Sequence, residues 1–159
     1  MRFNELMGGL DYPMFIVTVT DGDQLAGCLV GFAAQCSIEP ARFMVWLSKK
    51  NHTYQVASAA EVLAVHVPTQ ANLDLATLFG TRTGFDVDKF DRCAWRTGPG
   101  GVPVLTDCQQ WFTGRVLSRF DTGDHEGLLL APDAVGPATG LGQLGFQQVK
   151  HLDAGNEAG

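Results

Sequence analysis

Residues 14–33 read MFIVTVTDGDQLAGCLVGFA, and this stretch decides the fold that we predict. Its first seven residues are rich in β-branched side chains, which favour strands. Asp21-Gly22 follows them directly and is typical of a tight turn between two antiparallel strands. A second apolar run over residues 26–33, with a bend at Gly31, completes a predicted β-hairpin.

The rest of the chain repeats short apolar segments between turn residues. Further strands are predicted at residues 42–48, 62–67, 108–120, 124–131 and 145–149, and short helices at residues 3–10, 51–60 and 71–79. Strands and helices do not alternate as they do around a parallel sheet. The pattern therefore predicts a mainly β fold, a closed antiparallel barrel with peripheral helices. Residues 80–103 are predicted to form a long surface loop, a kind of segment that is often functional.

Length and charge limit the class of protein. The 159 residues have the size of one domain, so we predict a single domain over residues 1–159, with a less well-defined tail from about residue 132. The formal net charge is −6, from 11 basic and 17 acidic residues, which argues against nucleic acid and anionic membranes as partners. The longest uncharged run, residues 24–38, is 15 residues long and too short to span a membrane.

The four cysteines are widely spaced along the chain, at Cys28, Cys36, Cys93 and Cys108. No two of them form a CxxC pair, and no histidine lies at zinc-finger spacing from them. We therefore predict free thiols in a reducing cytoplasm, with neither a disulfide framework nor a metal site.

One sequence motif lacks the neighbouring strand and helix that its usual function requires. Residues 140–145 match GxGxxG, the pattern of dinucleotide-binding folds. Pro137 stands just before the motif, and no strong strand leads into it. The 14 residues after it are too few for the helix, second strand and acidic residue that such a fold needs. We reject it as a dinucleotide site.

Two short segments are candidates for ligand contacts. Residues 48–53, SKKNHT, end a predicted strand and begin a predicted helix, so two lysines, two hydroxyls and helix N–H groups meet there. That set suits a phosphate, and the alternative is a capped helix with solvated lysines. His125 follows Gly123-Asp124 before an apolar strand. It is either a turn residue with a structural hydrogen bond or a pocket residue that contacts a ligand or transfers a proton.

Several segments share their order and spacing with one protein family. They are residues 26–31 (AGCLVG), 35–40 (QCSIEP), 45–48 (VWLS) with Asn51 and Thr53, 88–90 (DKF), Trp95, 98–105 (GPGGVPVL) and 123–125 (GDH). Over roughly residues 5–131 the chain thereby resembles the flavin reductase-like, FMN-binding split-barrel proteins. The resemblance implies a six-stranded antiparallel Greek-key split barrel. It also implies a homodimer with a flavin in a groove at the subunit interface.

The resemblance further implies an NAD(P)H-dependent flavin reductase, which transfers hydride from NADH or NADPH to FMN or FAD. Such enzymes often pass the reduced flavin to a separate monooxygenase partner. Carried over to this sequence, the implied contacts along the isoalloxazine and ribityl chain are Val30, Gly31, Gln35, Cys36 and Ser37. The implied phosphate contacts are Ser48, Lys50, Asn51 and Thr53. His125 is the implied catalytic residue, beside the nicotinamide.

The first matching segment departs from the family pattern. Where the family often has hydroxyl side chains, this chain has Leu29, Gly31, Phe32 and Ala34, so backbone N–H groups take the place of side-chain donors. The choice among FMN, FAD and a deazaflavin therefore stays open. Three alternatives to the reductase also remain: a deazaflavin-using oxidoreductase on the same barrel, a non-catalytic flavin-binding carrier, and a structural dimer with a vestigial groove.

Overall fold

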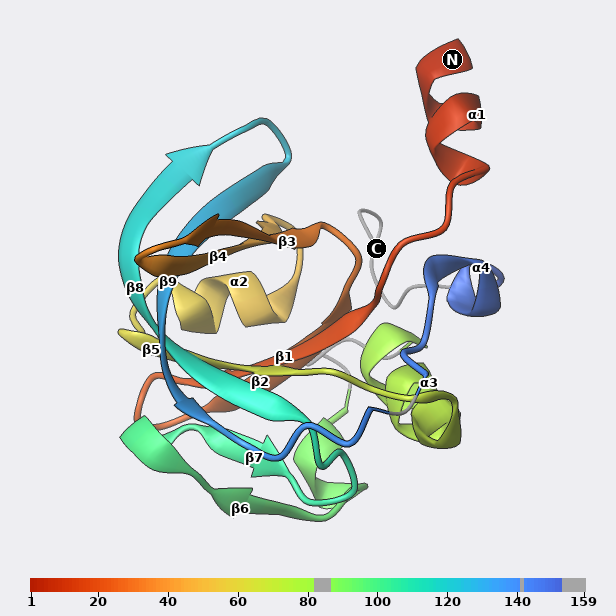
Figure 1. The fold of residues 1–159 in the computed structure, drawn as a ribbon. Helices are drawn as coiled ribbons and strands as arrows, with labels where there is room; N and C mark the ends of the chain where they lie inside the picture. The colour runs from red at the N-terminus through yellow and green to blue at the C-terminus, as the bar shows by residue number, and fades with distance from the viewer. Residues whose placement is uncertain (82–86, 141, 153–159) are drawn as a thin grey trace.

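The computed structural model describes residues 1–81, 87–140 and 142–152, which form a mainly β structure built around one strongly curled antiparallel sheet (Figure 1). Within these residues the sheet has seven strands in the order β2-β1-β5-β8-β9-β4-β3. Their bounds are Phe15–Thr20 (β1), Leu25–Val30 (β2), Ala33–Ile38 (β3), Ala41–Ser48 (β4), Val62–His66 (β5), Trp111–Asp121 (β8) and His125–Val135 (β9). A separate two-stranded sheet pairs β6 (Trp95–Thr97) with β7 (Pro103–Leu105).

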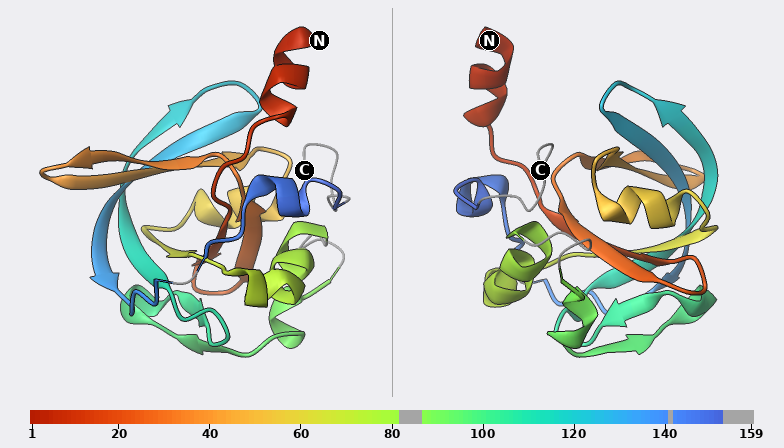
Figure 2. Two further views of the ribbon diagram at one scale, coloured as in Figure 1. Left: turned by 45° about the vertical axis from the view of Figure 1, so that its right-hand side comes forward. Right: turned by 180° about the vertical axis from the view of Figure 1, so that it is seen from behind.

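Short helices lie inside and beside the curled sheet. They are α1 (Arg2–Gly8), α2 (His52–Ala57), α3 (Leu73–Thr81) and α4 (Phe146–Val149), with the 3-10 turns η1 (Gln70–Asn72), η2 (Lys89–Asp91) and η3 (Pro99–Gly101). Helix α2 lies within the curve of the sheet, whereas α3 and α4 lie outside it and α1 projects away (Figures 1 and 2). Val56 and Ala57 of α2 accordingly belong to the same buried apolar cluster as Val17, Leu47 and Leu63 of the strands.

The structure confirms the predicted fold class and the opening hairpin. Strands β1 and β2 pair antiparallel from Phe15↔Val30 to Thr20↔Leu25, around the turn at residues 21–24. The second predicted strand, however, is divided in two, because β2 ends at Val30 and β3 begins at Ala33. This division raises the number of strands in the main sheet from the six that the resemblance implied to seven.

Two other predictions about local structure were wrong. Residues 145–149 form the N-cap and the whole of α4 and not a strand, because the Gln148 side chain accepts a hydrogen bond from the Gly145 N–H and closes a helical turn. The predicted loop at residues 80–103 contains β6 and two 3-10 turns, while its residues 82–86 lie outside the described residues. The hairpin from β6 to β7 turns at Gly100 and Gly101, whose φ values of 77° and 83° suit glycine.

Gly27 of β2 is closely packed, so a larger residue at this position tests how tightly the barrel wall is packed. A Cβ added there would lie 2.6 Å from Phe79 Cε1 and 3.0 Å from the Val17 carbonyl oxygen. Because one of these atoms belongs to the backbone of the neighbouring strand, we expect Gly27→Ala to lower the free energy of unfolding by about 1–3 kcal/mol. Chemical unfolding measures this loss. The control is Gly8→Ala, where an added Cβ meets nothing within 4 Å. Equal stability of the two variants would contradict the expected overpacking.

Candidate functional site

A pocket of about 370 Å³ lies between the barrel and the two end segments of the chain. One wall comes from the ends of β2 and β4 and the start of β9. The other comes from α1, the segment before β1, and α4 with the residues after it. The barrel wall consists of Cys28, Leu29, Val30, Gly31, Phe32, Trp46, Leu47, Ser48, Asn51 and His125, with Gly80 of α3 beside it, and the terminal wall of Asn4, Met7, Gly8, Tyr12, Met14, Phe146, Val149, Lys150 and Leu152.

Strand pairing explains why the barrel wall brings distant residues together. Strands β4 and β9 run antiparallel, so the last residue of one, Ser48, pairs with the first residue of the other, His125. The Trp46 N–H donates to the Phe32 carbonyl oxygen at 2.9 Å and holds the turn between β2 and β3 against β4. Gly31 in that turn packs against Tyr12, since a Cβ at Gly31 would lie 2.7 Å from Tyr12 Cε2.

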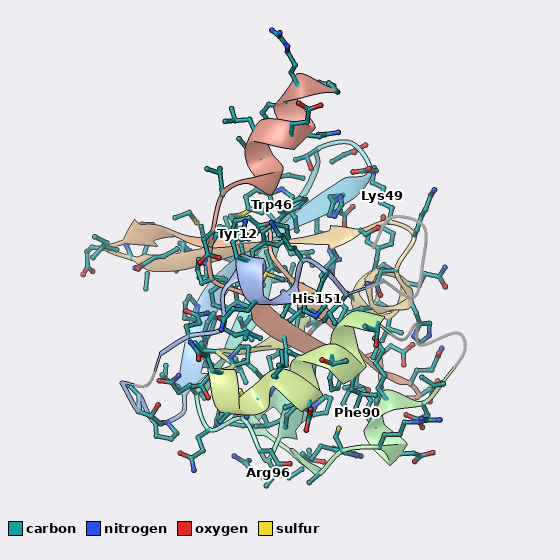
Figure 3. The ribbon with its side chains drawn as sticks, turned by 90° about the vertical axis from the view of Figure 1, so that its right-hand side faces the viewer. Tyr12, Trp46, Lys49, Phe90, Arg96 and His151 are labelled. Atoms are coloured by element: carbon teal, nitrogen blue, oxygen red, sulfur yellow. The ribbon has the colours of Figure 1, made fainter. Side chains whose placement is uncertain are left out.

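The terminal wall is held by contacts between residues more than 130 positions apart. The rings of Tyr12 and Phe146 stack with centroids 4.6 Å apart and planes at 10°. The Gln147 side chain donates to the carbonyl oxygens of Gly8 and Leu10, and its backbone N–H donates to Asp11 Oδ1. Tyr12 of this wall and Trp46 of the opposite wall both line the pocket, and Figure 3 labels their side chains. We call this set of contacts the terminal clasp.

The start of α2 supplies polar groups beside the pocket. Asn51 is the N-cap of the helix, and its Oδ1 accepts from the Thr53 N–H at 2.9 Å. Ser48 Oγ accepts from the Lys50 N–H at 3.4 Å. Since these bonds use only acceptor atoms, the Ser48 hydroxyl hydrogen and the Asn51 amide hydrogens are not consumed by them.

His125 is oriented by contacts on two sides. Its Nδ1 lies 2.7 Å from Asp124 Oδ1. Because a carboxylate only accepts, Nδ1 carries the proton, and in the neutral ring Nε2 is then an acceptor. This hydrogen bond, with a smaller contribution from the charge of Lys50, holds the pKa of Asp124 below its usual value. The phenyl ring of Phe32 lies against the imidazole, with centroids 5.0 Å apart and planes tilted by 52°.

The structure brings together five of the ten residues that the sequence singled out. Those that line the pocket are Val30, Gly31, Ser48, Asn51 and His125. The other five lie outside its lining. Gln35, Cys36 and Ser37 lie on β3, part of a hairpin that projects from the barrel (Figure 2). Lys50 is exposed, and Thr53, in the first turn of α2, is 1% exposed.

Sequence reasoning missed the whole terminal wall. Tyr12, Phe146 and Lys150 carry no local motif, and they reach the pocket only through the long-range clasp. Trp46 lies within a segment that the sequence had matched and Phe32 lies between two such segments, yet only the folded chain shows that both line the pocket. An aromatic residue in place of a family hydroxyl at position 32 was the one signal available.

The matched segment at residues 88–90 belongs to a second pocket, of about 420 Å³, beside β2. The Lys89 ammonium donates to the carbonyl oxygens of Gly27 and Phe79, at 2.8 and 3.2 Å. Burial lowers its pKa from the usual lysine value. Asp88 Oδ1 caps the turn by accepting from the Phe90 N–H. These contacts tie β2 to the end of α3, which is a structural role.

Within residues 1–81, 87–140 and 142–152, no group of three or more His, Cys, Asp and Glu side chains is arranged to hold a metal ion. The four cysteines are free thiols. No helix in the described part of the chain is long and apolar enough to cross a bilayer.

The curled antiparallel sheet with an aromatic-lined pocket at its rim agrees with the split-barrel class that the sequence resembles. Residues 7–150 match the Flavin reductase like domain, and the chain belongs to that family. NADH:FAD oxidoreductase SgcE6 of Streptomyces globisporus C-1027 has a similar fold, with a TM-score of 0.81 at 19% identity over 98% of this chain and 88% of that chain.

Two curated relatives are similar in sequence. FMN reductase (NADH) RutF of Methylorubrum extorquens is 31% identical over 137 residues, which cover 84% of this chain and 64% of that relative. Stachydrine N-demethylase reductase subunit Stc3 of Rhizobium meliloti is 26% identical over 139 residues, which cover 85% of this chain and 58% of that relative. The chain thus spans less than two thirds of the length of both.

Proposed function

We propose that this protein is an NAD(P)H-dependent flavin reductase that binds FMN or FAD in the 370 Å³ pocket. The observation that carries the proposal is the meeting, in that one pocket, of Val30, Gly31, Ser48, Asn51 and His125. The names of the relatives support it, since they include an FMN reductase that uses NADH and an NADH:FAD oxidoreductase.

The chemistry of the lining fits a planar, anionic cofactor. Aromatic and aliphatic side chains dominate both walls, and none of the described residues that line the pocket is Asp or Glu. Ligand pockets of this kind combine an apolar lining with a few polar groups that fix orientation. Ser48 and Asn51 would supply hydrogen-bond donors, Lys150 would supply positive charge on the terminal wall, and His125 would supply an acceptor at Nε2 on the barrel wall.

The remaining predicted contacts are part of the same proposal. Lys50 and Thr53 flank Asn51 at the start of α2, and we retain them as contacts of the flavin phosphate. Gln35, Cys36 and Ser37 lie on β3, an edge strand of the sheet, so a groove completed by a second copy of the chain would bring them to the cofactor.

A bound flavin would supply the acceptor for a hydride from nicotinamide, and the residues of this chain would position the two rings. The protein itself then needs little acid–base chemistry, because the cofactors carry the reaction. Val30 and Gly31 would border the flavin through their backbone. His125, held by Asp124, would offer Nε2 to the carboxamide of the hydride donor.

The visible spectrum of the purified protein, before and after anaerobic addition of NADH, tests the proposal. A flavin spectrum that bleaches on addition of NADH or NADPH is the expected result. A flavin spectrum that persists with both donors contradicts the reductase and favours a carrier. A colourless protein that FMN, FAD and a deazaflavin all fail to reconstitute contradicts every flavin-based function.

The proposal includes a homodimer. Ile38, at the end of the exposed strand β3, is 82% exposed, and exposed apolar strand residues are typical of interfaces. We expect sedimentation at micromolar concentration to give twice the mass of one chain, and a monomer with bound flavin would contradict it. A separate monooxygenase that accepts the reduced flavin is the proposed partner, and the free thiols fit a reaction in the cytoplasm.

A further inference from the structure

Phe32 presents an unusual aromatic surface at the pocket. Its side chain is 54% exposed although it lines the cavity. Removing a phenylalanine ring from water is energetically favourable. A half-exposed ring in a pocket is therefore a surface that a ligand can bury with a gain in binding free energy. Most of the other exposed large apolar residues, such as Ile38 and Phe120, do not line this pocket.

The backbone holds Phe32 in place. Its carbonyl oxygen accepts from the Trp46 N–H at 2.9 Å, and the preceding Gly31 is packed against Tyr12. The phenyl ring is therefore presented by a turn that contacts β4 on one side and the terminal clasp on the other. A ring fixed in this way loses little conformational freedom when a ligand packs against it.

The neighbour of the ring indicates which ligand it serves. The Phe32 ring contacts the imidazole of His125, with the ring centroids 5.0 Å apart, and Asp124 accepts a hydrogen bond from His125 Nδ1. The phenyl and imidazole rings thus form one continuous surface. In the proposed function, the backbone of Val30 and Gly31 borders the flavin, whereas His125 belongs to the hydride donor.

We propose that Phe32 is a specificity-determining residue that packs against the nicotinamide ring of the hydride donor beside His125. This inference rests on the proposed function. It states that the Phe32 side chain determines the affinity for the hydride donor. Planar rings attract one another in offset or tilted arrangements such as the one that Phe32 and His125 already adopt. Phe32 would set the affinity for the donor and leave that for the flavin unchanged.

The test compares Phe32→Leu with Phe120→Leu, a matched control whose ring is 48% exposed on β8 and does not line the pocket. We expect Phe32→Leu to weaken NAD⁺ binding to the flavin-loaded protein about tenfold, as measured by calorimetry, and to raise the KM for NADH similarly. Flavin affinity should change less than about twofold. Phe32→Tyr keeps an aromatic ring at this position and should bind the donor as the wild type does. Phe120→Leu should change neither affinity.

Each contrary result has a distinct meaning. Normal donor binding by Phe32→Leu in a protein that binds flavin and is reduced by NADH overturns the inference alone. Weakened flavin binding with normal donor binding overturns it too, because Phe32 would then contact the flavin. A wild-type protein that binds no flavin contradicts the proposed function and the inference with it.

A double variant separates direct contact from an effect through His125. If Phe32 contacts the donor itself, Phe32→Leu should weaken NAD⁺ binding further in a His125→Ala background. If the double variant binds NAD⁺ as His125→Ala does, Phe32 acts only by positioning the imidazole, and the direct contact is refuted. The melting temperatures of all variants show whether each protein remains folded.

Discussion

Replacing His66 with leucine is expected to lower the free energy of unfolding by about 3 kcal/mol. The His66 side chain is fully buried on β5. Its Nδ1 lies 3.0 Å from the Ile16 carbonyl oxygen, and its Nε2 accepts from the Leu105 N–H at 3.0 Å. Leucine leaves both backbone groups buried without these partners, and each costs about 1–3 kcal/mol. The exposed His151 provides the control, because His151→Leu should change stability by less than about 0.5 kcal/mol.

The same histidine makes the stability depend on pH. Burial lowers the pKa of His66 from 6.5 to about 4, so between these values the unfolded chain binds a proton that the folded chain does not. The contribution of the neutral ring is therefore complete above pH 6.5 and is lost as the pH falls toward 4. A shift of this size corresponds to about 3 kcal/mol.

Unfolding experiments at several pH values isolate this effect. The stability gap between the wild type and His66→Leu should narrow from about 3 kcal/mol at pH 7.5 to less than about 1 kcal/mol at pH 4. Taking the difference between the two proteins removes the contribution of carboxylates such as Asp21 and Asp121, whose pKa values are also lowered. A gap that stays constant over this range would show that His66 does not titrate on unfolding.

The second large effect is expected from His125→Ala, which should lower NAD(P)H-dependent turnover by about one to two powers of ten. That range corresponds to the loss of one good contact with the hydride donor, worth about 1.5–3 kcal/mol. Flavin affinity and melting temperature should change little, because His125 lies at the pocket rim and its Nδ1 hydrogen-bonds to the exposed Asp124.

Three measurements on one variant separate this role from a purely structural one. Steady-state kinetics, flavin affinity and melting temperature are compared with those of His151→Ala, whose histidine is not part of the pocket lining. A histidine that only holds the turn predicts the reverse pattern, in which stability falls and turnover per folded molecule stays normal. That pattern would falsify the catalytic assignment of His125.

The sequence predicts those elements of the fold that are stabilised by residues close together along the chain. The hairpin from β1 to β2 was predictable because a β-branched run, an Asp-Gly turn and a second apolar run follow one another directly. Residues 145–149 were not, since five mainly apolar or amide residues are compatible with either a strand or a helical turn. Their helix depends on Gln148 and on the clasp around Gln147.

The same distinction between local and long-range contacts applies to the candidate site. Ser48, Asn51 and His125 lie where strands end or helices begin, and such positions can be found by reading the sequence. The packing of Tyr12 against Gly31 cannot, because it depends on two segments that only tertiary structure brings together. The sequence predicted that backbone N–H groups around Gly31 replace side-chain donors, and the folded chain packs its own Tyr12 ring against Gly31.

The terminal clasp has a consequence for the order of events during synthesis. Tyr12 leaves the ribosome early, but the Phe146 ring on which it stacks is translated 134 residues later. Contacts between such distant residues form late in folding. A nascent chain can therefore complete the β1–β2 hairpin while it is still being translated, yet it lacks one wall of the ligand pocket until α4 has emerged. Under the proposed function, cofactor capture then follows the emergence of α4, and a bound ligand cannot guide the earlier stages of folding.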